Sequence, residues 1–455
     1  MQPQLREYQL ALVRRTQTEF AAGHRAVCLQ APTGSGKTVI AARILHQSVA
    51  LGRTPWMLAH RKELLDQIVA ALRLEQVPYW VTAAGWHRHT DETPGRGVMV
   101  GSTQTVARRY QNLPPPNFMI FDEAHHTPSR TWSELFNAFP TTKILGLTAT
   151  PQRADGKGLA GFFSVLVHGP QTRDLIALGN LAPYRLYAPP GIDLRNVHVR
   201  MGEFVTKEAE TAVGKITGNI VAHYMRLCEG KQALVFAPSR KASHDLVDAF
   251  NACGVVARHV DGETPDEQRR MSVADFKAGS LKVLCNVDLY GEGVDLPAVD
   301  VLILARPTMS KPLYLQQVGR VLRPAPGKTA LILDHVANVE RHGLPDELRI
   351  WGLDGTVKHK AAKETVIKVR VCPECFAAQS PTLVCRYCGY KFEVNDRKIE
   401  TVDGELVEIL DPKRPWGDET QLKNMFMLKM PPLLAAAMAR KVMRQRAAKQ
   451  QGVMA

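Results

Sequence analysis

The sequence lacks any long apolar run. Nowhere in its 455 residues do apolar residues continue for about 18 positions, the length with which a helix crosses a bilayer. Residues 1–7 lack the apolar core of a secretory signal peptide. No low-complexity tract dominates and 45% of the residues are hydrophobic, so most of the chain is expected to fold around packed cores. We therefore expect a cytoplasmic protein with no membrane partner.

Acidic residues are in deficit. Asp and Glu number 44 against 58 Lys and Arg, which gives a formal net charge of +14. This balance is typical of proteins with a polyanionic partner, most often nucleic acid, although positive charge also aids solubility. The length is sufficient for two to four domains.

Cysteine is scarce, with eight residues in two groups. Four are scattered beside apolar segments and are expected to be small buried residues of a reducing compartment. These are Cys28, Cys228, Cys253 and Cys285. The others form two C-x₂-C pairs nine residues apart, which suits tetrahedral structural Zn²⁺; disulfides and an iron–sulfur cluster are the alternatives. These are Cys372, Cys375, Cys385 and Cys388.

A glycine-rich segment, Ala31 to Thr38, reads A-P-T-G-S-G-K-T. It follows a strand-like run, Ala26 to Leu29, and opens a helix-like run, Val39 to Leu45. A phosphate-binding loop has this context, with Ala31 in place of the usual first glycine.

The chemistry of each position in this loop supports that reading. Glycines let successive backbone N–H groups curl around phosphate oxygens, and the helix N-terminus adds partial positive charge. Lys37 is predicted to reach the β and γ phosphates of a nucleoside triphosphate, and Thr38 to coordinate Mg²⁺. The residues predicted to hold the nucleotide here are Thr33, Gly34, Ser35, Gly36, Lys37 and Thr38.

Two adjacent carboxylates, Asp122 and Glu123, follow the apolar run Phe118 to Phe121. Ligands of open α/β sheets bind at the carboxyl ends of strands, so this is where catalytic acids belong. A short apolar run before two acids also occurs in ordinary folds; the phosphate loop upstream makes the catalytic reading the better one.

Strand-like and helix-like segments alternate in two blocks, as in parallel doubly wound sheets. Only the first block carries a phosphate loop, so we expect one nucleotide site in the cleft between two α/β lobes. The predicted parts are a first lobe (1–175), a connection (176–215), a second lobe (216–360), a four-cysteine zinc module (366–395) and a basic, partly helical tail (396–455).

Over residues 5–324 the motifs occur in an order that resembles superfamily 2 helicases and translocases. The matching segments are Leu5–Gln9, Ala31–Thr38, Ala59–Arg61, Gly101–Thr105, Asp122–His125, Thr148–Thr150, Val235–Ser239, Gly291–Asp295 and Gln316–Arg323. The resemblance implies two tandem RecA-like P-loop lobes with parallel sheets, followed here by a zinc ribbon and a basic tail.

The resemblance also implies roles for single residues. Gln9 would recognise adenine, and Gly293 and Asp295 would help to bind the nucleotide. The residues expected to contact a nucleic-acid backbone are Arg61, Thr103, Gln104 and Ser239. Those expected to couple hydrolysis to lobe movement are His125, Thr148, Thr150 and Gln316. His126 is assigned no role.

Phosphoryl transfer to water requires charge neutralisation and an in-line water rather than covalent help. Asp122 is therefore expected to hold Mg²⁺ and Glu123 to orient or deprotonate the attacking water. Arg320 and Arg323 lie three apart on a helix-like run and are expected to reach across the cleft as arginine fingers.

Two phrases, Ala59–Gln67 and Asp261–Pro265, resemble the restriction-enzyme motor subunits within this superfamily. The added cysteine module makes the chain similar to bacterial RadD-like DNA-dependent ATPases. This implies an ATP-dependent DNA helicase or translocase in repair, recombination or replication-fork processing. An RNA helicase is an alternative, because the acidic box reads D-E-A-H. A nucleotide-switched nucleic-acid-binding protein is another.

The last part of the tail is rich in Lys and Arg and lacks acidic residues from Lys429 onward. We expect it to bind nucleic acid or an acidic protein partner, with a solvated tail as the alternative.

Overall fold

The computed structural model describes residues 4–86, 94–152, 158–189, 199–200, 203–204, 217–287, 289, 299–354 and 369–392. Residues 1–394 form one compact unit and residues 395–455 another. Everything described below belongs to the first unit. Among the described residues, no helix combines the length and the apolar character that crossing a bilayer requires.

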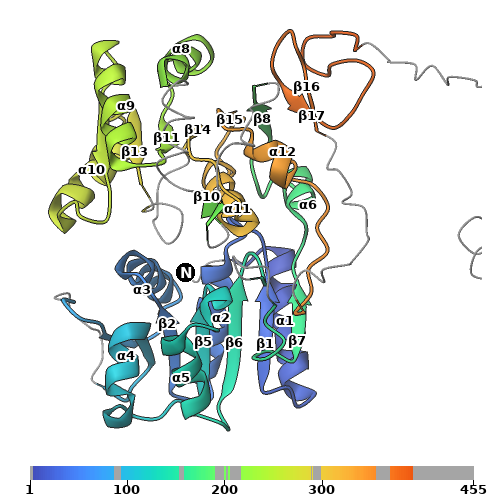
Figure 1. Ribbon diagram of the computed structural model, residues 1–455. Helices are drawn as coiled ribbons and strands as arrows, with labels where there is room; N and C mark the ends of the chain where they lie inside the picture. The colour runs from blue at the N-terminus through green and yellow to red at the C-terminus, as the bar shows by residue number, and fades with distance from the viewer. Residues whose placement is uncertain are drawn as a thin grey trace, which may run out of the picture. The chain divides into compact units, whose positions relative to one another are not determined.

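The first lobe is built on a seven-stranded sheet in which all strands are parallel. Its strands, in spatial order, are β3 (Tyr79–Thr82), β4 (Val98–Ser102), β2 (Pro55–Ala59), β5 (Phe118–Asp122), β6 (Lys143–Thr148), β1 (Ala26–Gln30) and β7 (Val165–His168). Figure 1 shows β2, β5, β6, β1 and β7 side by side in this order. Strands β1, β2 and β5 are buried along their whole length, as expected where helices cover both faces of a parallel sheet.

Helices and two short 3₁₀ turns connect these strands. They are α1 (Glu7–Ala21), α2 (Lys37–Ala50), α3 (Lys62–Leu74), α4 (Thr103–Arg109), η1 (Tyr110–Asn112), η2 (Ala124–His126), α5 (Arg130–Ala138) and α6 (Thr172–Ala177). Helix α3 buries five apolar side chains in the core, which fixes the position of its N-terminal residues beside β2.

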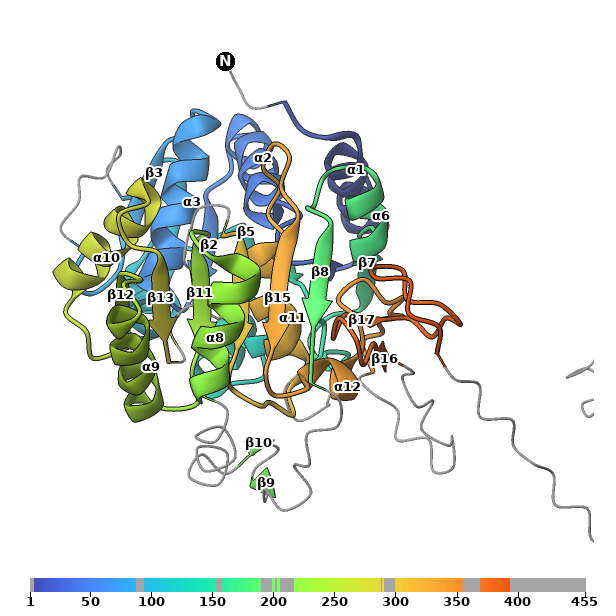
Figure 2. The ribbon, with the colours of Figure 1, turned by 90° about the horizontal axis from the view of Figure 1, so that it is seen from above.

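The second lobe has a six-stranded parallel sheet. In spatial order its strands are β12 (Ala257–Val260), β13 (Val283–Asn286), β11 (Ala233–Phe236), β14 (Val301–Leu304), β15 (Ala330–Asp334) and β8 (Tyr184–Tyr187). Its helices are α8 (Thr217–Cys228), α9 (Arg240–Ala252), α10 (Asp266–Ala278), α11 (Lys311–Val321) and α12 (Asn338–His342). Figure 2 looks across this sheet, with β12 and β8 at opposite edges.

Strand β8 falls in the segment expected to be a connection, yet it completes the second sheet by pairing with β15. The same region contains a small antiparallel pair, β9 (Val199–Arg200) and β10 (Glu203–Phe204). The chain therefore leaves the first sheet from its edge strand β7 and enters the second sheet at its edge strand β8.

A strap, Leu344–Leu353, runs from the end of α12 back to the first lobe. The backbone of Arg349 exchanges two hydrogen bonds with the side-chain amide of Gln171, at 3.1 and 3.2 Å. The carbonyl oxygen of Leu353 accepts from the backbone N–H groups of Leu159 and Ala160 at 2.6 and 3.0 Å. The two lobes are thus joined by the strap as well as by the segment between β7 and β8.

The four-cysteine module contains a short antiparallel pair, β16 (Arg370–Val371) and β17 (Ala378–Gln379), and lies against β8 in both views (Figures 1 and 2). Ala377 forms a bridge with Tyr187 of β8, and Ala188 N–H donates to the carbonyl of Phe376 at 3.2 Å. Ala378 is 2% exposed and belongs to the core of the second lobe. The module is therefore packed into that lobe.

Candidate functional site: a phosphate loop and an acidic box between two lobes

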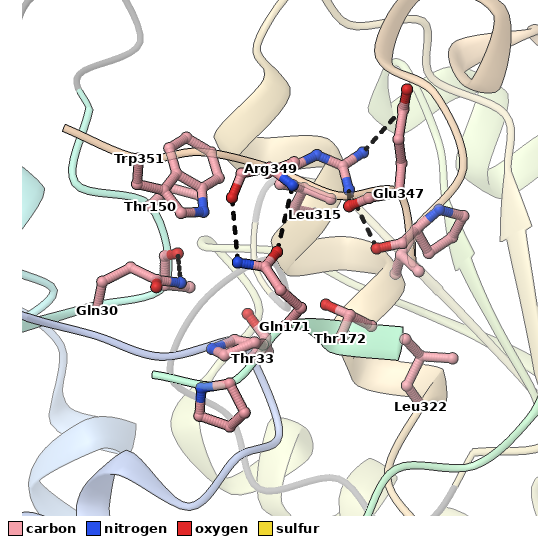
Figure 3. Close-up of a pocket in the computed structure, with 16 residues that line it drawn as sticks. Gln30, Thr33, Thr150, Gln171, Thr172, Leu315, Leu322, Glu347, Arg349 and Trp351 are labelled. Atoms are coloured by element: carbon pink, nitrogen blue, oxygen red, sulfur yellow. Dashed lines mark hydrogen bonds and ion pairs between the residues drawn. The ribbon is translucent and has the colours of Figure 1, made fainter. Parts of the chain in front are cut away.

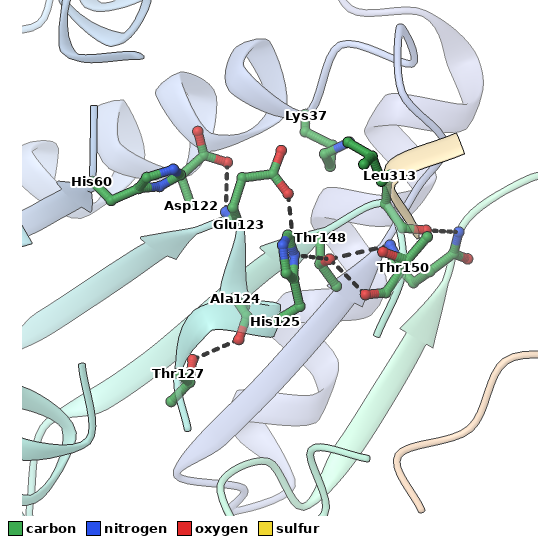
Figure 4. A network of polar contacts seen from close by, with 12 residues as sticks. Lys37, His60, Asp122, Glu123, Ala124, His125, Thr127, Thr148, Thr150 and Leu313 are labelled. Carbon is green, nitrogen blue, oxygen red and sulfur yellow. Dashed lines mark hydrogen bonds and ion pairs between the residues drawn. The ribbon is translucent and has the colours of Figure 1, made fainter. Parts of the chain in front are cut away.

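Three neighbouring strands of the first sheet, β5, β6 and β1, deliver the predicted catalytic segments to one edge. The phosphate loop follows β1, the acidic box follows β5, and the Thr148–Thr150 segment ends β6. Because parallel strands end at the same edge, motifs far apart in sequence become neighbours. Figure 4 shows Lys37, Asp122, Glu123, His125 and Thr148 gathered there.

The phosphate loop has the backbone that its glycines predict. Gly34 and Gly36 have φ values of 86° and 82°, in the left-handed region that side chains oppose. A Cβ at Gly36 would lie 2.5 Å from the side-chain nitrogen of Gln9, so any side chain at this position would clash with Gln9. The Lys37 ammonium donates to the carbonyls of Ala31 and Pro32 at 3.1 and 3.4 Å, which folds the lysine back over its own loop.

Gln9 braces this loop. Its side-chain oxygen accepts from Arg6 N–H at 3.0 Å, and its side-chain nitrogen donates to the carbonyl of Ser35 at 3.1 Å. The Tyr8 hydroxyl donates to the same carbonyl at 2.7 Å. Sequence reasoning missed Tyr8, although it stands next to Gln9 in the motif. The start of α1 and the phosphate loop are therefore held together.

The acidic box combines a buried carboxylate with a strained backbone. Asp122 is 4% exposed. Burial is the largest cause that raises its pKa, to about 7; the neighbouring Glu123 carboxylate acts in the same direction, and Lys37 opposes the shift. Glu123 adopts a left-handed backbone with φ of 52°, a conformation that costs free energy and clusters at functional sites. A cation beside these two acids would relieve their repulsion.

The predicted coupling residues form one hydrogen-bonded network (Figure 4). His125 Nδ1 lies 3.2 Å from Thr148 Oγ1 and 3.4 Å from Glu123 Oε2. The Thr148 hydroxyl donates to the carbonyl of Thr150 at 2.9 Å. The acidic box and the end of β6 are therefore linked through His125.

Helix α11 brings the second lobe to the phosphate loop. A Cβ at Gly319 would lie 2.3 Å from the Cβ of Thr33, so only glycine permits this approach. Arg320 is 7% exposed, and its charge contributes to lowering the pKa of Lys37, after burial, which is the larger cause. Gln316 is also buried in α11. Arg323 lies beyond the last residue of the helix, so it does not share a helical face with Arg320.

A cavity lies beside these elements (Figure 3). The phosphate loop borders it only at Pro32 and Thr33, and α11 borders it at Gly319. The strap closes it with Arg349, whose backbone is paired with Gln171. Lys37 is not among the residues that line the cavity.

The residues expected to bind a nucleic-acid backbone occupy different settings. Arg61 Nη1 donates to the carbonyl of Leu289 in the second lobe at 2.8 Å. Gln104 is exposed and donates to the carbonyl of His60 at 3.4 Å. Thr103 is fully buried, and its hydroxyl donates to Ala59 at 3.0 Å.

The last of these residues lies on the second lobe. Ser239 is half-buried, and its hydroxyl accepts from Ala242 N–H at 3.2 Å to cap α9. Two predicted nucleotide-binding residues, Gly293 and Asp295, lie outside the described residues, as does the basic tail.

The four clustered cysteines converge as their spacing predicts. Their sulfur atoms all lie within 4.8 Å of one another, with separations of 3.5 Å for Cys372–Cys388 and 3.6 Å for Cys375–Cys385. These values are far from a disulfide bond length of about 2.05 Å. Gly389 has a φ of 77° in the second knuckle, as expected for a tight turn. The arrangement is that of a metal site.

The scattered cysteines follow the prediction with one exception. Cys28, Cys228 and Cys285 are buried. Cys253 is exposed, because it follows the last residue of α9 and precedes the turn at Gly254. The prediction was wrong for Cys253.

Two family models match the chain. Residues 2–153 match the res subunit of type III restriction enzymes, and residues 218–325 match the helicase conserved C-terminal domain. The first match lies within the first lobe and the second within the second lobe.

Known proteins resemble most of the chain. A 51.5 kDa protein of a Lactococcus phage is 33% identical over 393 residues, covering 84% of this chain and 83% of the phage protein. A putative DNA 3'-5' helicase, Rad25, of Haloarcula marismortui is 27% identical over 388 residues, covering 79% of this chain but only 58% of that protein. Among solved structures, a fragment of a putative HsdR subunit of a type I restriction enzyme from Vibrio vulnificus superposes with a TM-score of 0.57 at 19% identity, over 75% of this chain and 67% of that chain. At that identity the superposition shows the fold alone.

Proposed function

Because the chain belongs to the superfamily 2 helicases of the restriction-enzyme motor type, we propose that it hydrolyses ATP to move along DNA, with or without separating its strands. One observation supports this most directly. Gly319 and Arg320 of the second lobe lie against the phosphate loop of the first, so a nucleotide there would meet groups from both lobes. Hydrolysis in such a site depends on how the lobes are placed, which is how a motor couples chemistry to movement.

Each predicted catalytic residue has a role that its surroundings support. Lys37 would neutralise the β and γ phosphates, Glu123 would orient the attacking water, and Arg320 would stabilise the charge that develops during phosphoryl transfer. Arg323, beyond the helix end, would assist Arg320 after a change in lobe position. Gln316, which lies in α11 with Arg320, would couple the change in lobe position to hydrolysis.

Members of this family use ATP with Mg²⁺. Thr38, in the first turn of α2, and Asp122 are the residues that would hold the ion. The fit rests on Asp122, since its carboxyl is buried beside a second acid and its pKa is raised to about 7. A divalent cation supplies the positive charge that such a pair and the phosphates lack.

The cysteine cluster is proposed to hold Zn²⁺. In a tetrahedral site with Zn–S distances of about 2.3 Å, neighbouring sulfurs are about 3.8 Å apart, close to the 3.5 and 3.6 Å observed. With four thiolates committed, the metal would be structural. Free thiols support the reducing, cytoplasmic location that the sequence predicts.

DNA is the preferred track because of the Rad25 relative's name and the likeness to restriction-enzyme motors. The net charge of +14 fits either nucleic acid. RNA is the second candidate, since the D-E-A-H box is shared with RNA-acting relatives. A role in repair, recombination or fork processing extends the same proposal.

The test is steady-state ATPase activity with single-stranded DNA, duplex DNA, forked DNA and RNA of matched length. We expect stimulation by DNA above that by RNA. Glu123→Gln should lower the stimulated rate by about 10²–10⁴-fold, as loss of a general base does, while retaining nucleotide binding. Lys37→Ala should lose nucleotide binding and hydrolysis together.

The outcomes separate the candidates. Stimulation by RNA alone would replace DNA with RNA as the track. No stimulation by any strand, with ATP still bound, would favour a nucleotide-switched binding protein. Wild-type hydrolysis by Glu123→Gln would refute the catalytic assignment itself.

A further inference from the structure

Three imidazole rings form a continuous row in the first lobe. The ring of His126 lies between those of His60 and His125, with centroid separations of 4.6 and 4.2 Å. His60 follows β2, whereas His125 and His126 belong to the 3₁₀ turn after the acidic box. Neighbouring strands β2 and β5 thus place the three rings in contact.

One end of the row touches two residues proposed to bind the nucleic-acid backbone. Arg61 Nε donates to His60 Nε2 at 3.3 Å, and Gln104 Nε2 donates to the carbonyl of His60 at 3.4 Å. When a phosphate draws the Arg61 guanidinium towards itself, the hydrogen bond to His60 must lengthen, bend or carry the ring with it.

The other end touches the hydrolysis site. His125 Nδ1 lies 3.4 Å from Glu123 Oε2 and 3.2 Å from Thr148 Oγ1. The position of the His125 ring therefore bears on the carboxylate proposed to orient water.

The middle ring is supported by a buried indole and by the turn that carries it. The indole of Trp132, which is 4% exposed, stacks on His126 with a centroid separation of 6.5 Å and an interplanar angle of 27°. The backbone N–H of His126 donates to the carbonyl of Glu123 at 3.0 Å, which fixes the turn from which the ring extends. A ring supported in this way cannot absorb a movement of His60 by moving away from His125, because packed interiors deform little.

We propose that His60 and His126 are positioning residues that transmit engagement of nucleic acid at Arg61 to Glu123 through His125. This inference rests on the proposed function and adds to it the route by which the strand stimulates hydrolysis. Neither ring touches the nucleotide-binding loop in the contacts described, although the charge of His60 acts on Asp122, so the rates with and without DNA are compared. Contiguous packed side chains with bonded ends are a physical means of such coupling.

The test uses the full-length chain with His60→Ala, His126→Ala and the double variant. The measured quantity is the ratio of kcat with saturating single-stranded DNA to kcat without it. Coupling residues of this kind change a ratio by about 2- to 30-fold, and we expect a decrease in that range. The dissociation constant for a labelled single strand, measured by anisotropy, should stay within about twofold of the wild-type value because Arg61 itself is retained.

Three comparisons make the test specific. His126→Phe keeps a ring between His60 and His125 and should retain most of the stimulation. The double variant should lose no more than the single variants, because both interrupt one route. His24→Ala, a half-exposed histidine of the same lobe that lies 2.9 Å from Ser164, is the matched control and should behave as wild type.

Thermal melts identify variants that fail to fold, and His60→Gln, which removes the ring from the row, then replaces His60→Ala with the same expected decrease. Wild-type stimulation in folded His60→Ala and His126→Ala would overturn the inference while leaving the proposed function intact. Losses that multiply in the double variant would also overturn a single route. A wild-type protein that no strand stimulates would overturn the proposed function together with the coupling.

Discussion

The contact between Gly319 and Thr33 allows a prediction with a worked magnitude. In Gly319→Ala, the new Cβ would lie 2.3 Å from the Cβ of Thr33, whereas ordinary contact begins at 3.4 Å. The second lobe must therefore withdraw by the difference, 3.4 − 2.3 = 1.1 Å, before the methyl group fits. Arg320, the next residue, withdraws with it.

A misplacement of about 1 Å costs on the order of 10²-fold in rate when it separates reacting groups. We therefore expect Gly319→Ala to lower the DNA-stimulated kcat about 100-fold while retaining ATP binding, since the loop itself is unchanged. Alanine is a better helix former than glycine by about 1 kcal/mol, so α11 should become more stable. Lower activity with an unchanged or higher melting temperature is the expected combination.

The assay is steady-state ATPase activity with DNA, alongside binding of a fluorescent ATP analogue and a thermal melt. Gly161→Ala is the matched control, because a Cβ there meets nothing within 4 Å. The three atoms nearest to the new methyl group all belong to Thr33, so Gly319→Ala should cost far less in a Thr33→Gly background. Wild-type kcat in Gly319→Ala would refute the reasoning, and so would an equal loss in both backgrounds.

Three further predictions concern stability. The Arg43 guanidinium donates two hydrogen bonds, at 2.9 and 3.0 Å, to the carboxylate of Glu75, which is 1% exposed. Arg43→Ala removes this partner from a buried carboxylate and should lower the free energy of unfolding in urea by about 3–5 kcal/mol. A loss below about 1 kcal/mol would show that water replaces the guanidinium. Burial raises the pKa of Asp334 from 3.8 to about 6, so its contribution to stability is fully present below pH 3.8 and is lost as the pH rises through 6. Relative to Asp334→Asn, the wild-type free energy of unfolding should fall by about 2 kcal/mol between pH 4 and pH 7, and parallel pH profiles would contradict this. Elemental analysis first establishes which metal the four cysteines bind. Chelation of that metal, or Cys385→Ser, should lower the melting temperature of the second lobe, because Ala378 of the module is part of that lobe's core. An unchanged melting temperature after removal of the metal would contradict its structural role.

The sequence predicted the sheets well because parallel strands buried on both faces are continuous apolar runs. The strand-like runs Ala26 to Leu29 and Phe118 to Phe121 begin where β1 and β5 begin, and each strand extends one residue further than its run. The phosphate loop and the second cysteine knuckle could also be predicted from the sequence, since glycine readily adopts the positive φ found at Gly36 and Gly389.

Contacts between segments that are distant in the sequence could not be predicted from local patterns. Nothing local in Tyr184–Tyr187 reveals that this strand completes the second sheet, because its partner is Ala330–Leu333. The row of rings requires the pairing of β2 with β5, and His126 was therefore assigned no role. Arg323 was placed on the helical face of Arg320 because its spacing fits, yet the helix ends at Val321.

The packing of the four-cysteine module against β8 also bears on whether the second sheet has an open edge. The last strand of a sheet offers unpaired N–H and C=O groups, which invite another chain to add a strand. Here Phe376 and Ala377 occupy that position along Tyr187 and Ala188. Loss of this packing would expose a sheet edge of the kind that can pair with another chain, so the module covers an edge as well as extending the core of the second lobe.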